Sequence, residues 1–225
     1  MTEMNMRNMT NLLPGLIGCV LTAILSASIS AVHAESADSA ENPRVLMKTT
    51  DGDITIELYA DKSPVTVENF LRYADDGHYD GTVFHRVISN FMIQGGGFDA
   101  ELKEKETRSP IVNESKNKLH NTRGTLAMAR TSDPDSAAAQ FFINQRSNLR
   151  LDWSGGKDGY TVFGEVGVGM QVVDIMSLTD TGSAQAQTTR GPTVFQDVPV
   201  QPIVILPGTR VTQCSNSASI STRLR

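Results

Sequence analysis

The sequence contains few of the residues that metal, redox and covalent chemistry require. It has 2 cysteines, Cys19 and Cys214, and 4 histidines that do not follow the short, regular spacing of metal ligands. A Gly-x-Ser-x-Gly nucleophile motif is absent, as is a glycine-rich loop that ends in Lys-Ser or Lys-Thr. No helix start follows the three glycines at 95–97, so they do not indicate a phosphate site. We therefore expect no metal and no cofactor.

An excess of basic charge is also absent. The chain carries 20 Lys and Arg residues against 25 Asp and Glu residues, which gives a formal net charge of -5. Domains that bind nucleic acid usually carry a basic patch, and segments that bind anionic membranes carry clusters of Lys and Arg. We therefore expect neither nucleic acid nor an anionic membrane to be the main partner.

Residues 1–34 have the features of a secretory signal peptide. Arg7 supplies a positive charge, and residues 12–29 are mostly apolar. The small residues that follow offer a cleavage site after Ala34. We therefore expect residues 1–34 to be removed and the mature protein to be exported to the periplasm.

Two alternatives to cleavage remain open for this segment. A permanent anchor would need about 20 predominantly apolar residues, whereas Pro14 and several serines interrupt this run. A lipid on Cys19 is a minor alternative, because the preceding residues resemble a lipoprotein motif. Loss of the segment would leave Cys214 as the sole cysteine, so an intrachain disulfide is not expected.

The rest of the chain divides into a leader, one domain and a tail. Residues 35–42 and 209–225 are polar and lack periodicity, which is typical of flexible segments. Residues 43–208 contain no obvious linker or internal repeat. This length allows a single domain to bury a core.

Short strands dominate the predicted secondary structure. Asp51 and Gly52 lie between the strand-like runs 45–50 and 53–59, which is a strong hairpin signal. Further strands are predicted over residues 82–88, 91–94, 124–129, 140–144, 161–166 and 202–206. Many short strands with few helices favour a closed or nearly closed antiparallel barrel.

Two helices are predicted. The first starts at Pro64, with Ser63 as its N-cap, and ends near Gly77. The second covers residues 170–177, where apolar side chains recur at helical spacing.

Residues 84–98 combine an arginine, large apolar residues and an amide. Strand alternation places Phe84, Arg86 and Ile88 on one face. From spacing alone, Arg86 is either paired inside the fold or presented at a surface, and both remain open. The apolar residues near it, judged by spacing alone, fit a core better than a pocket.

Several long motifs, in order along the chain, resemble those of the cyclophilin family. They are Ser-Pro-Val-Thr-Val-Glu-Asn-Phe at 63–70, Phe-His-Arg-Val-Ile-Ser-Asn-Phe-Met-Ile-Gln-Gly-Gly at 84–96, Gly-Thr-Leu-Ala-Met-Ala-Arg at 124–130, Ser-Ala-Ala-Ala-Gln-Phe-Phe-Ile at 136–143 and Tyr-Thr-Val-Phe-Gly at 160–164. The similarity covers about residues 44–207. With its signal peptide, the chain is most similar to the periplasmic cyclophilins of Gram-negative bacteria.

This resemblance implies a mainly β fold, a closed eight-stranded antiparallel β-barrel capped by two α-helices. It also implies the functional residues. Arg86 matches the catalytic arginine, and Gln94 matches the amide that helps to hold the substrate. The matched substrate-binding residues are Phe91, Met92, Phe142 and Leu151 in the walls of the proline pocket, Met128, Ala129, Arg130 and Gln140 at its floor and rim, and Tyr160 at its edge.

The implied activity is peptidyl-prolyl cis/trans isomerisation, with proline-containing unfolded or flexible exported polypeptides as substrates. We expect a monomer that assists protein folding. One rival is a chaperone or scaffold that binds proline segments and turns them over only incidentally. A small-ligand barrel of the lipocalin kind has less support, because the matched residues belong to an outer groove.

The chain departs from the family pattern at three positions. Arg130 replaces an asparagine that is frequent in eukaryotic members, and Gly97 replaces a common aspartate. Arg150 stands where those members carry a tryptophan that contributes to cyclosporin binding. We therefore expect cyclosporin to bind only weakly, unless the nearby Trp153 compensates.

Overall fold

The computed structural model describes residues 42–208 and 210–212. The predicted signal peptide, nearly all of the leader and most of the tail lie outside these residues, together with Cys19 and Cys214. Within the described ranges, no helix is both long and apolar enough to cross a membrane.

The predicted N-terminal hairpin is present, with its turn one residue earlier than expected. Strands β1 (Arg44–Thr49) and β2 (Gly52–Leu58) pair antiparallel, with Thr49 opposite Gly52. Gly52 has a φ of +134°, which glycine adopts without a steric penalty, so it begins the second strand. The alternate apolar side chains of β2 are fully buried, as period-two alternation predicts.

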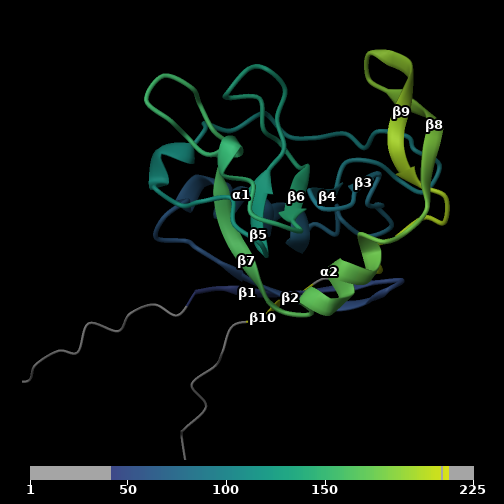
Figure 1. Cartoon of the computed structure of the whole chain (residues 1–225), viewed down its shortest axis with the longest axis horizontal. Coiled ribbons are helices and arrows are strands. Elements are labelled where there is room, and N and C mark those ends of the chain that lie inside the picture. Colours follow the sequence, from purple (N-terminus) through teal and green to yellow (C-terminus); the bar gives the residue numbers. More distant parts are fainter. Residues whose placement is uncertain (1–41, 209, 213–225) are drawn as a thin grey trace, which may run out of the picture. The chain divides into compact units, whose positions relative to one another are not determined.

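Eight strands form one antiparallel sheet in the order β10-β1-β2-β7-β5-β6-β4-β3 (Figure 1). The remaining strands of this sheet are β3 (Arg86–Ile88), β4 (Met92–Gly95), β5 (Thr125–Met128), β6 (Phe141–Asn144), β7 (Val162–Val168) and β10 (Arg210–Thr212). Strand β10 falls in the predicted flexible tail. Its backbone pairs there with the edge of β1.

These strand pairings do not close the sheet into the expected eight-stranded barrel. Among the described residues, β10 and β3 are the two open edges of the sheet. The predicted strand at 202–206 contributes only single-residue bridges, from Val204 to Val83 and from Ile205 to Thr49. The proline at its start has no N–H to donate, which limits regular pairing there. The fold is therefore mainly β, with a curled open sheet and two helices.

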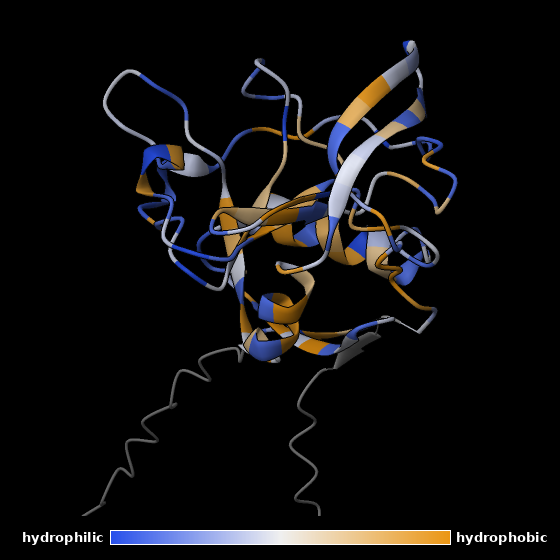
Figure 2. Ribbon diagram, turned by 45° about the vertical axis from the view of Figure 1, so that its right-hand side comes forward, coloured by the Kyte–Doolittle hydropathy of each residue, from blue (hydrophilic) through white to orange (hydrophobic). Residues whose placement is uncertain are grey.

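Both predicted helices are present. Helix α1 (Pro64–Asp75) and helix α2 (Met170–Met176) begin at the predicted residues. Each helix buries one apolar side. Many of the hydrophobic residues lie on the strands of the sheet and on these two helices (Figure 2). Two short 3-10 turns, η1 (Ser115–Asn117) and η2 (Leu149–Leu151), lie in the loops.

The N-terminal cap of α1 differs from the prediction. The Ser63 hydroxyl makes no cap hydrogen bond and instead donates to the Val162 carbonyl at 2.8 Å. The Glu114 carboxylate accepts hydrogen bonds from the backbone N–H groups of Val65, at 3.2 Å, and Thr66, at 2.8 Å. A carboxylate suits this position because the free N–H groups of the first helical turn carry partial positive charge.

Four aromatic side chains form the centre of the core. Phe70 of α1 lies with its ring centroid 5.0 Å from that of Tyr79, 5.6 Å from that of Phe141 and 5.2 Å from that of Phe163. All four side chains are fully buried. Tilted and edge-to-face contacts of this kind stabilise aromatic pairs beyond the burial of their area. This cluster fixes α1 against the inner face of the sheet.

A second hairpin, which the sequence did not predict, lies beside β3. Strands β8 (Thr181–Thr188) and β9 (Gly191–Pro199) form a separate two-stranded sheet (Figure 1). Most side chains of β8 are exposed and are Thr, Ser, Ala, Gln or Gly. The apolar residues of β8 are two small alanines, Ala184 and Ala186, so its alternation of apolar and polar residues is too weak a signal to predict a strand.

We expect Gly96→Ala to lower the free energy of unfolding by about 1–3 kcal/mol. Gly96 has a φ of +85°, and an added Cβ would lie 2.9 Å from ring carbons of both Phe141 and Tyr79. Chemical denaturation measures the change. Gly182→Ala is the control, because an added Cβ there meets no atom within 4 Å. Equal stability of the two variants would contradict the packing described for the core.

Candidate active site

Strand register brings an arginine, an amide and an apolar ring together on the outer face of the sheet. Arg86 of β3 is paired with Gln94 of β4, and Gln94 is paired with Phe142 of β6. Phe142 is paired in turn with Ala127 of β5. Directly paired residues point to the same side of a sheet. These four side chains therefore form one row across four neighbouring strands.

The alternate residues of the same strands face the interior. Val87, Ile93 and Phe141 belong to the main core, whereas Met92 and Phe142 belong to a smaller apolar cluster on the outer face. Core packing of one set thus fixes the direction of the other. The sequence placed Phe84 on the same face as Arg86, but Phe84 lies in the main core because β3 begins only at Arg86.

A hollow of about 140 Å³ lies beside this row. Its lining consists of nine of the eleven residues predicted for the site, namely Arg86, Phe91, Met92, Gln94, Ala129, Arg130, Phe142, Leu151 and Tyr160. Met92 and Phe142 are almost fully buried. The Phe142 and Tyr160 rings meet edge to face, with centroids 5.6 Å apart. The hollow therefore has apolar walls and a polar rim.

The other two predicted residues do not line the hollow. Met128 is buried in the main core, so its side chain does not line the hollow. Strand alternation explains this, because its neighbours Ala127 and Ala129 face outward. Gln140 lies next to the hollow, where its Oε1 accepts a hydrogen bond from Gln94 Nε2 at 3.0 Å. This bond fixes the amide of Gln94 beside Arg86.

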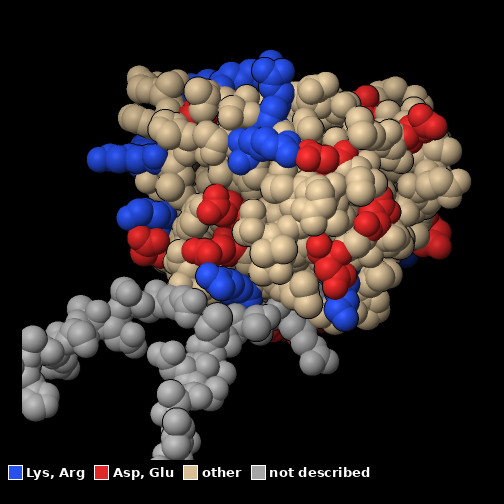
Figure 3. Space-filling model, turned by 60° about the horizontal axis from the view of Figure 1, so that its bottom comes forward, with Lys and Arg blue, Asp and Glu red and all other residues tan. Residues whose placement is uncertain are grey.

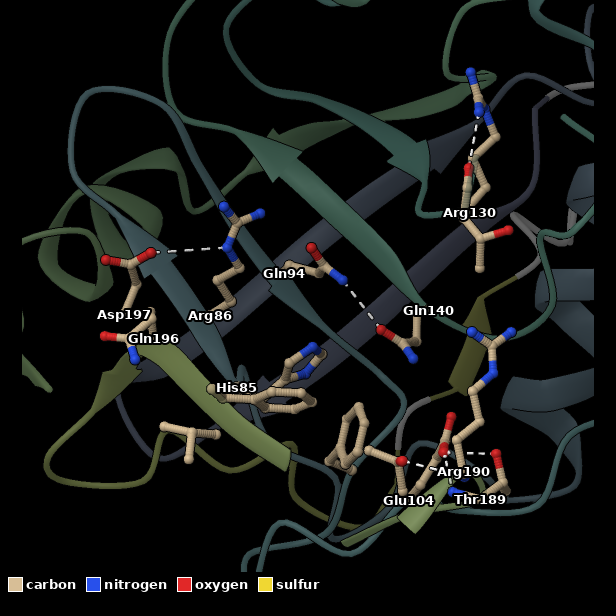
Figure 4. Close-up of a pocket in the computed structure, with 15 residues that line it drawn as sticks. His85, Arg86, Gln94, Glu104, Arg130, Gln140, Thr189, Arg190, Gln196 and Asp197 are labelled. Carbon is tan, nitrogen blue, oxygen red and sulfur yellow. Dashed lines mark hydrogen bonds and ion pairs between the residues drawn. The ribbon is translucent and has the colours of Figure 1, made fainter. Parts of the chain in front are cut away.

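Arg86 is presented at the surface and is not locked in an internal ion pair. Its side chain is 43% exposed. Within the described ranges, its sole ion pair joins Nε to Asp197 Oδ2 at 3.8 Å, which is beyond hydrogen-bond distance (Figure 4). The terminal nitrogens of the guanidinium therefore remain able to donate to a bound molecule. The sequence left open whether Arg86 is paired inside the fold or presented at a surface, and the structure shows it at the surface.

Arg130 has a different environment. Its guanidinium donates to the carbonyls of Thr131 at 2.9 Å, Asp158 at 2.7 Å and Gly159 at 3.3 Å. It also lies 4.6 Å from the centre of the Tyr160 ring, a cation–π contact. Arg130 thus connects two loops at the rim of the hollow, and the backbone beside Ala129 is held in place.

An anchor for Leu151 could not be found from the sequence. Asp152 accepts hydrogen bonds from the backbone and side-chain nitrogens of Asn121, at 2.7 and 2.9 Å, and from His120 Nδ1 at 2.8 Å. Burial opposes ionisation of this carboxyl, but these hydrogen bonds keep its pKa below the ordinary value. The Leu151 carbonyl accepts from the Tyr160 N–H at 2.8 Å. The hydrogen bonds of Asp152 and of the Leu151 carbonyl together fix the position of Leu151 in the wall of the hollow.

His85 lies directly behind Arg86 and was not predicted to take part in the site. Its ring is buried against Phe98 and Phe195, with centroids 4.7 and 5.7 Å away. Burial lowers the pKa of His85 from its ordinary value of 6.5 to about 4. The ring is therefore neutral at pH 7 and adds no positive charge next to the guanidinium.

Within the described part of the chain, no cluster of three or more His, Cys, Asp or Glu side chains could hold a metal ion. The groups that converge at the hollow are a guanidinium, two amides and apolar rings, which can bind, orient and donate hydrogen bonds.

Comparison with known proteins identifies related sequences. Residues 44–207 match the family described as cyclophilin type peptidyl-prolyl cis-trans isomerase/CLD. A peptidyl-prolyl cis-trans isomerase of Acinetobacter baylyi is 52% identical over 171 residues, which cover 76% of this chain and 87% of that protein. Peptidyl-prolyl cis-trans isomerase B of Escherichia coli is 50% identical over 164 residues, with 72% and 95% covered. Peptidyl-prolyl cis-trans isomerase A of Dickeya dadantii is 43% identical over 186 residues, with 83% and 94% covered.

The fold also resembles solved structures. A cyclophilin-type isomerase of Cryptosporidium parvum, crystallised in the presence of the dipeptide Ala-Pro, aligns with a TM-score of 0.60. The alignment covers 76% of this chain and 99% of that one, at 24% sequence identity. At this identity the likeness supports the fold alone.

We expect the free energy of unfolding to fall as the pH drops from about 6.5 to about 4, partly because of His85. Above pH 6.5 the ring is neutral in both states, and between these values the unfolded chain takes up the proton while the folded chain does not. His85 lowers the free energy of unfolding by about 3 kcal/mol once the pH has fallen to about 4, because each unit of pKa difference corresponds to about 1.4 kcal/mol. Denaturation of wild type and His85→Phe across this range measures it. Parallel stability curves for the two proteins would contradict the buried neutral ring.

Proposed function

Because this chain belongs to the family of cyclophilin-type peptidyl-prolyl cis-trans isomerases, it catalyses rotation about X–Pro bonds, and we propose that it does so in the groove beside Arg86. The observation that carries this proposal is a half-exposed guanidinium, in register with an amide and a phenyl ring, at the edge of an apolar hollow.

The reaction requires rotation and no change of covalent bonds. Conjugation between the imide nitrogen and the carbonyl gives the peptide bond a rotation barrier of about 18–20 kcal/mol. Uncatalysed X–Pro exchange therefore takes tens to hundreds of seconds, which is slow enough to limit folding. Such a reaction needs a site that holds the proline while the bond twists, together with a donor for the twisted state.

Arg86 fits the role of that donor. As the bond twists, the imide nitrogen loses conjugation and becomes a better hydrogen-bond acceptor. A guanidinium that donates to it at this stage stabilises the transition state more than either ground state, and so raises the rate. The donors of a guanidinium are rigid and planar. Its distance of 3.8 Å from Asp197 leaves these donors available.

The hollow fits the role of a proline clamp. Phe91, Met92, Phe142 and Leu151 offer apolar surface for the pyrrolidine ring, and the flexible methionine can adapt as the ring moves. Gln94, held by Gln140, can bind the peptide backbone next to it. The residue before proline would lie along Ala129 and the backbone of Arg130. Under this assignment the Arg130 side chain supports the rim and does not contact the substrate. Arginine in place of the asparagine of eukaryotic members is therefore compatible with catalysis.

The substrates we propose are exposed X–Pro segments of unfolded or flexible exported polypeptides, acted on in the periplasm by a monomer. The secretory features of residues 1–34 support this location. Nucleic acid fits poorly as a partner, because the net charge is -5 and acidic and basic groups are interspersed on the face shown in Figure 3. We also propose that the bridges made by Val204 and Ile205 complete a closed barrel, because they join Val83, which precedes β3, to Thr49 at the end of β1.

A chaperone that binds proline segments with incidental turnover is the second candidate. It would use the same hollow but would have no need of a guanidinium that can donate to the twisted bond. The availability of Arg86, which a binding role does not require, favours the catalytic function.

We expect Arg86→Ala to lower the rate of cis/trans exchange of an Ala-Pro peptide by about 10²–10³, because one preorganised donor to the transition state is lost. Exchange spectroscopy by NMR measures the rate. Circular dichroism and thermal unfolding serve as controls for the fold, since the side chain contributes little burial. A variant that folds and turns over at the wild-type rate would remove Arg86 from the mechanism.

We expect cyclosporin to inhibit the protein weakly and Arg150→Trp to tighten inhibition about tenfold or more. The Arg150 guanidinium lies 5.0 Å from the centre of the Phe91 ring, at the rim where a tryptophan would add apolar contact. Inhibition constants for the two proteins test this. Trp153→Ala is the control, and its expected inhibition constant equals that of wild type. Unchanged inhibition in Arg150→Trp would show that this position does not limit binding.

A further inference from the structure

The β8–β9 hairpin is fixed against the body of the domain and lies beside β3 (Figure 1). The Gln187 N–H donates to the Leu102 carbonyl at 2.9 Å, and the Glu104 N–H donates to the Gln187 carbonyl at 2.8 Å. The Phe195 ring of β9 meets the Phe98 ring edge to face, with centroids 4.9 Å apart. A side chain that β9 directs toward β3 is therefore held at a fixed place.

Strand β9 contains a β-bulge near its end. Gly182 pairs with Val198, and the next paired residues are Ala184 and Phe195. One residue of β8 therefore lies opposite two residues of β9, at 196 and 197. A bulge of this kind bends its strand and redirects a side chain, and bulges are common next to active sites.

The bulge directs the Asp197 carboxylate toward Arg86 (Figure 4). Asp197 has a φ of +61°, in the left-handed region that few residues other than glycine adopt. Aspartate and asparagine enter this region more readily than most. The Ser183 hydroxyl donates to Gln196 Oε1 at 2.7 Å and so connects the bulge to the facing strand. The backbone thus takes an uncommon conformation at the residue whose carboxylate faces Arg86.

The pair formed by these two side chains is an ion pair without a hydrogen bond. Asp197 Oδ2 lies 3.8 Å from Arg86 Nε, and the two side chains are 41% and 43% exposed. Ion pairs this exposed contribute little to the stability of a fold. Stability therefore does not account for the bulge or for the conformation of Asp197.

The Arg86 side chain has little else to orient it. Among the residues that the structure describes, none forms a hydrogen bond or a second ion pair with its guanidinium. The neighbouring amide of Gln94 is hydrogen-bonded to Gln140 instead. An arginine side chain has many rotamers, and ordering it costs conformational entropy. The attraction of Asp197 is the interaction in the described residues that can restrict it.

We propose that Asp197 is a positioning residue for the isomerisation, which holds the guanidinium of Arg86 beside the hollow before the substrate binds. The inference rests on the proposed function of Arg86. Because the carboxylate attracts the guanidinium by charge alone, it restricts the side chain and leaves its donors for the twisted X–Pro bond. A donor that is already in place stabilises the transition state without reorganisation.

We expect removal of this carboxylate to lower the exchange rate of a bound Ala-Pro peptide about two- to fivefold, the range that an exposed ion pair supports. The dissociation constant is expected to stay at the wild-type value, because the apolar hollow binds the proline. Asp197→Asn and Asp197→Gly both remove the charge, and both residues tolerate a positive φ, so the bulge is kept. The two variants are expected to behave alike.

The test measures exchange rate and dissociation constant by NMR for both variants, with unfolding curves as a check of the fold. Asp180→Asn is the matched control, because Asp180 is exposed, precedes the hairpin and does not line the hollow. Its rate is expected to equal that of wild type. The order parameter of the Arg86 Nε–Hε bond is expected to fall in both Asp197 variants and to be retained in Asp180→Asn, a change that a merely structural role would not produce.

A double-mutant cycle determines whether Asp197 acts through Arg86. Asp197→Asn is expected to cause no further loss when it is added to Arg86→Ala. An equal loss in both backgrounds would overturn the positioning role, as would wild-type exchange rates in both Asp197 variants. The single variant Arg86→Ala separates this result from the proposed function. If Arg86→Ala loses its rate and the Asp197 variants do not, the positioning role alone fails, whereas a wild-type rate in Arg86→Ala would contradict the proposed function itself.

Discussion

A guanidinium can assist the rotation of an X–Pro bond only if it is held beside the proline and keeps donors that are not hydrogen-bonded to a carboxylate. In this protein, strand register meets the first requirement, because Arg86, Gln94 and Phe142 are directly paired on three neighbouring strands and point outward together. The second is met because the ion pair of Arg86 with Asp197, at 3.8 Å, is beyond hydrogen-bond distance. The residues between them point inward to the core. The site therefore depends on the register of β3, β4 and β6, since a slip by one residue would move every one of these side chains to the opposite face.

The rest of the fold maintains this register. The aromatic cluster around Phe70 fixes α1 on the inner face of the sheet, and Glu114 satisfies the first N–H groups of that helix. On the outer face, the hydrogen bonds of Asp152 and Arg130 position the loops that supply Leu151 and Tyr160. A neutral His85 behind the site keeps a further positive charge away from Arg86. Rigid support of this kind is what a preorganised site requires.

Local patterns in the sequence predicted the N-terminal hairpin, both helices and most strands, because alternation and turn residues are short-range signals. The motif resemblance supplied the residues of the hollow. Interactions distant in sequence could not be predicted: Glu114 caps a helix 49 residues away, and strand β10 pairs with β1. The β8–β9 hairpin escaped prediction because most residues of β8 are small or polar and are exposed. Met128 faces the core because its neighbours in the chain, Ala127 and Ala129, face outward. The sheet remains open, whereas a closed barrel was expected.

We propose that the site separates two roles: apolar side chains bind the proline, and Arg86 acts on the twisted bond. The most direct measurement determines, for one prolyl peptide, both the dissociation constant and the exchange rate on the enzyme by NMR line-shape analysis. Arg86→Lys is expected to keep the dissociation constant and lose exchange rate, because a lysine keeps the charge but not the planar donors. Phe142→Ala is expected to weaken binding. A dissociation constant that rises in Arg86→Lys while the exchange rate of the bound peptide stays unchanged would contradict this account.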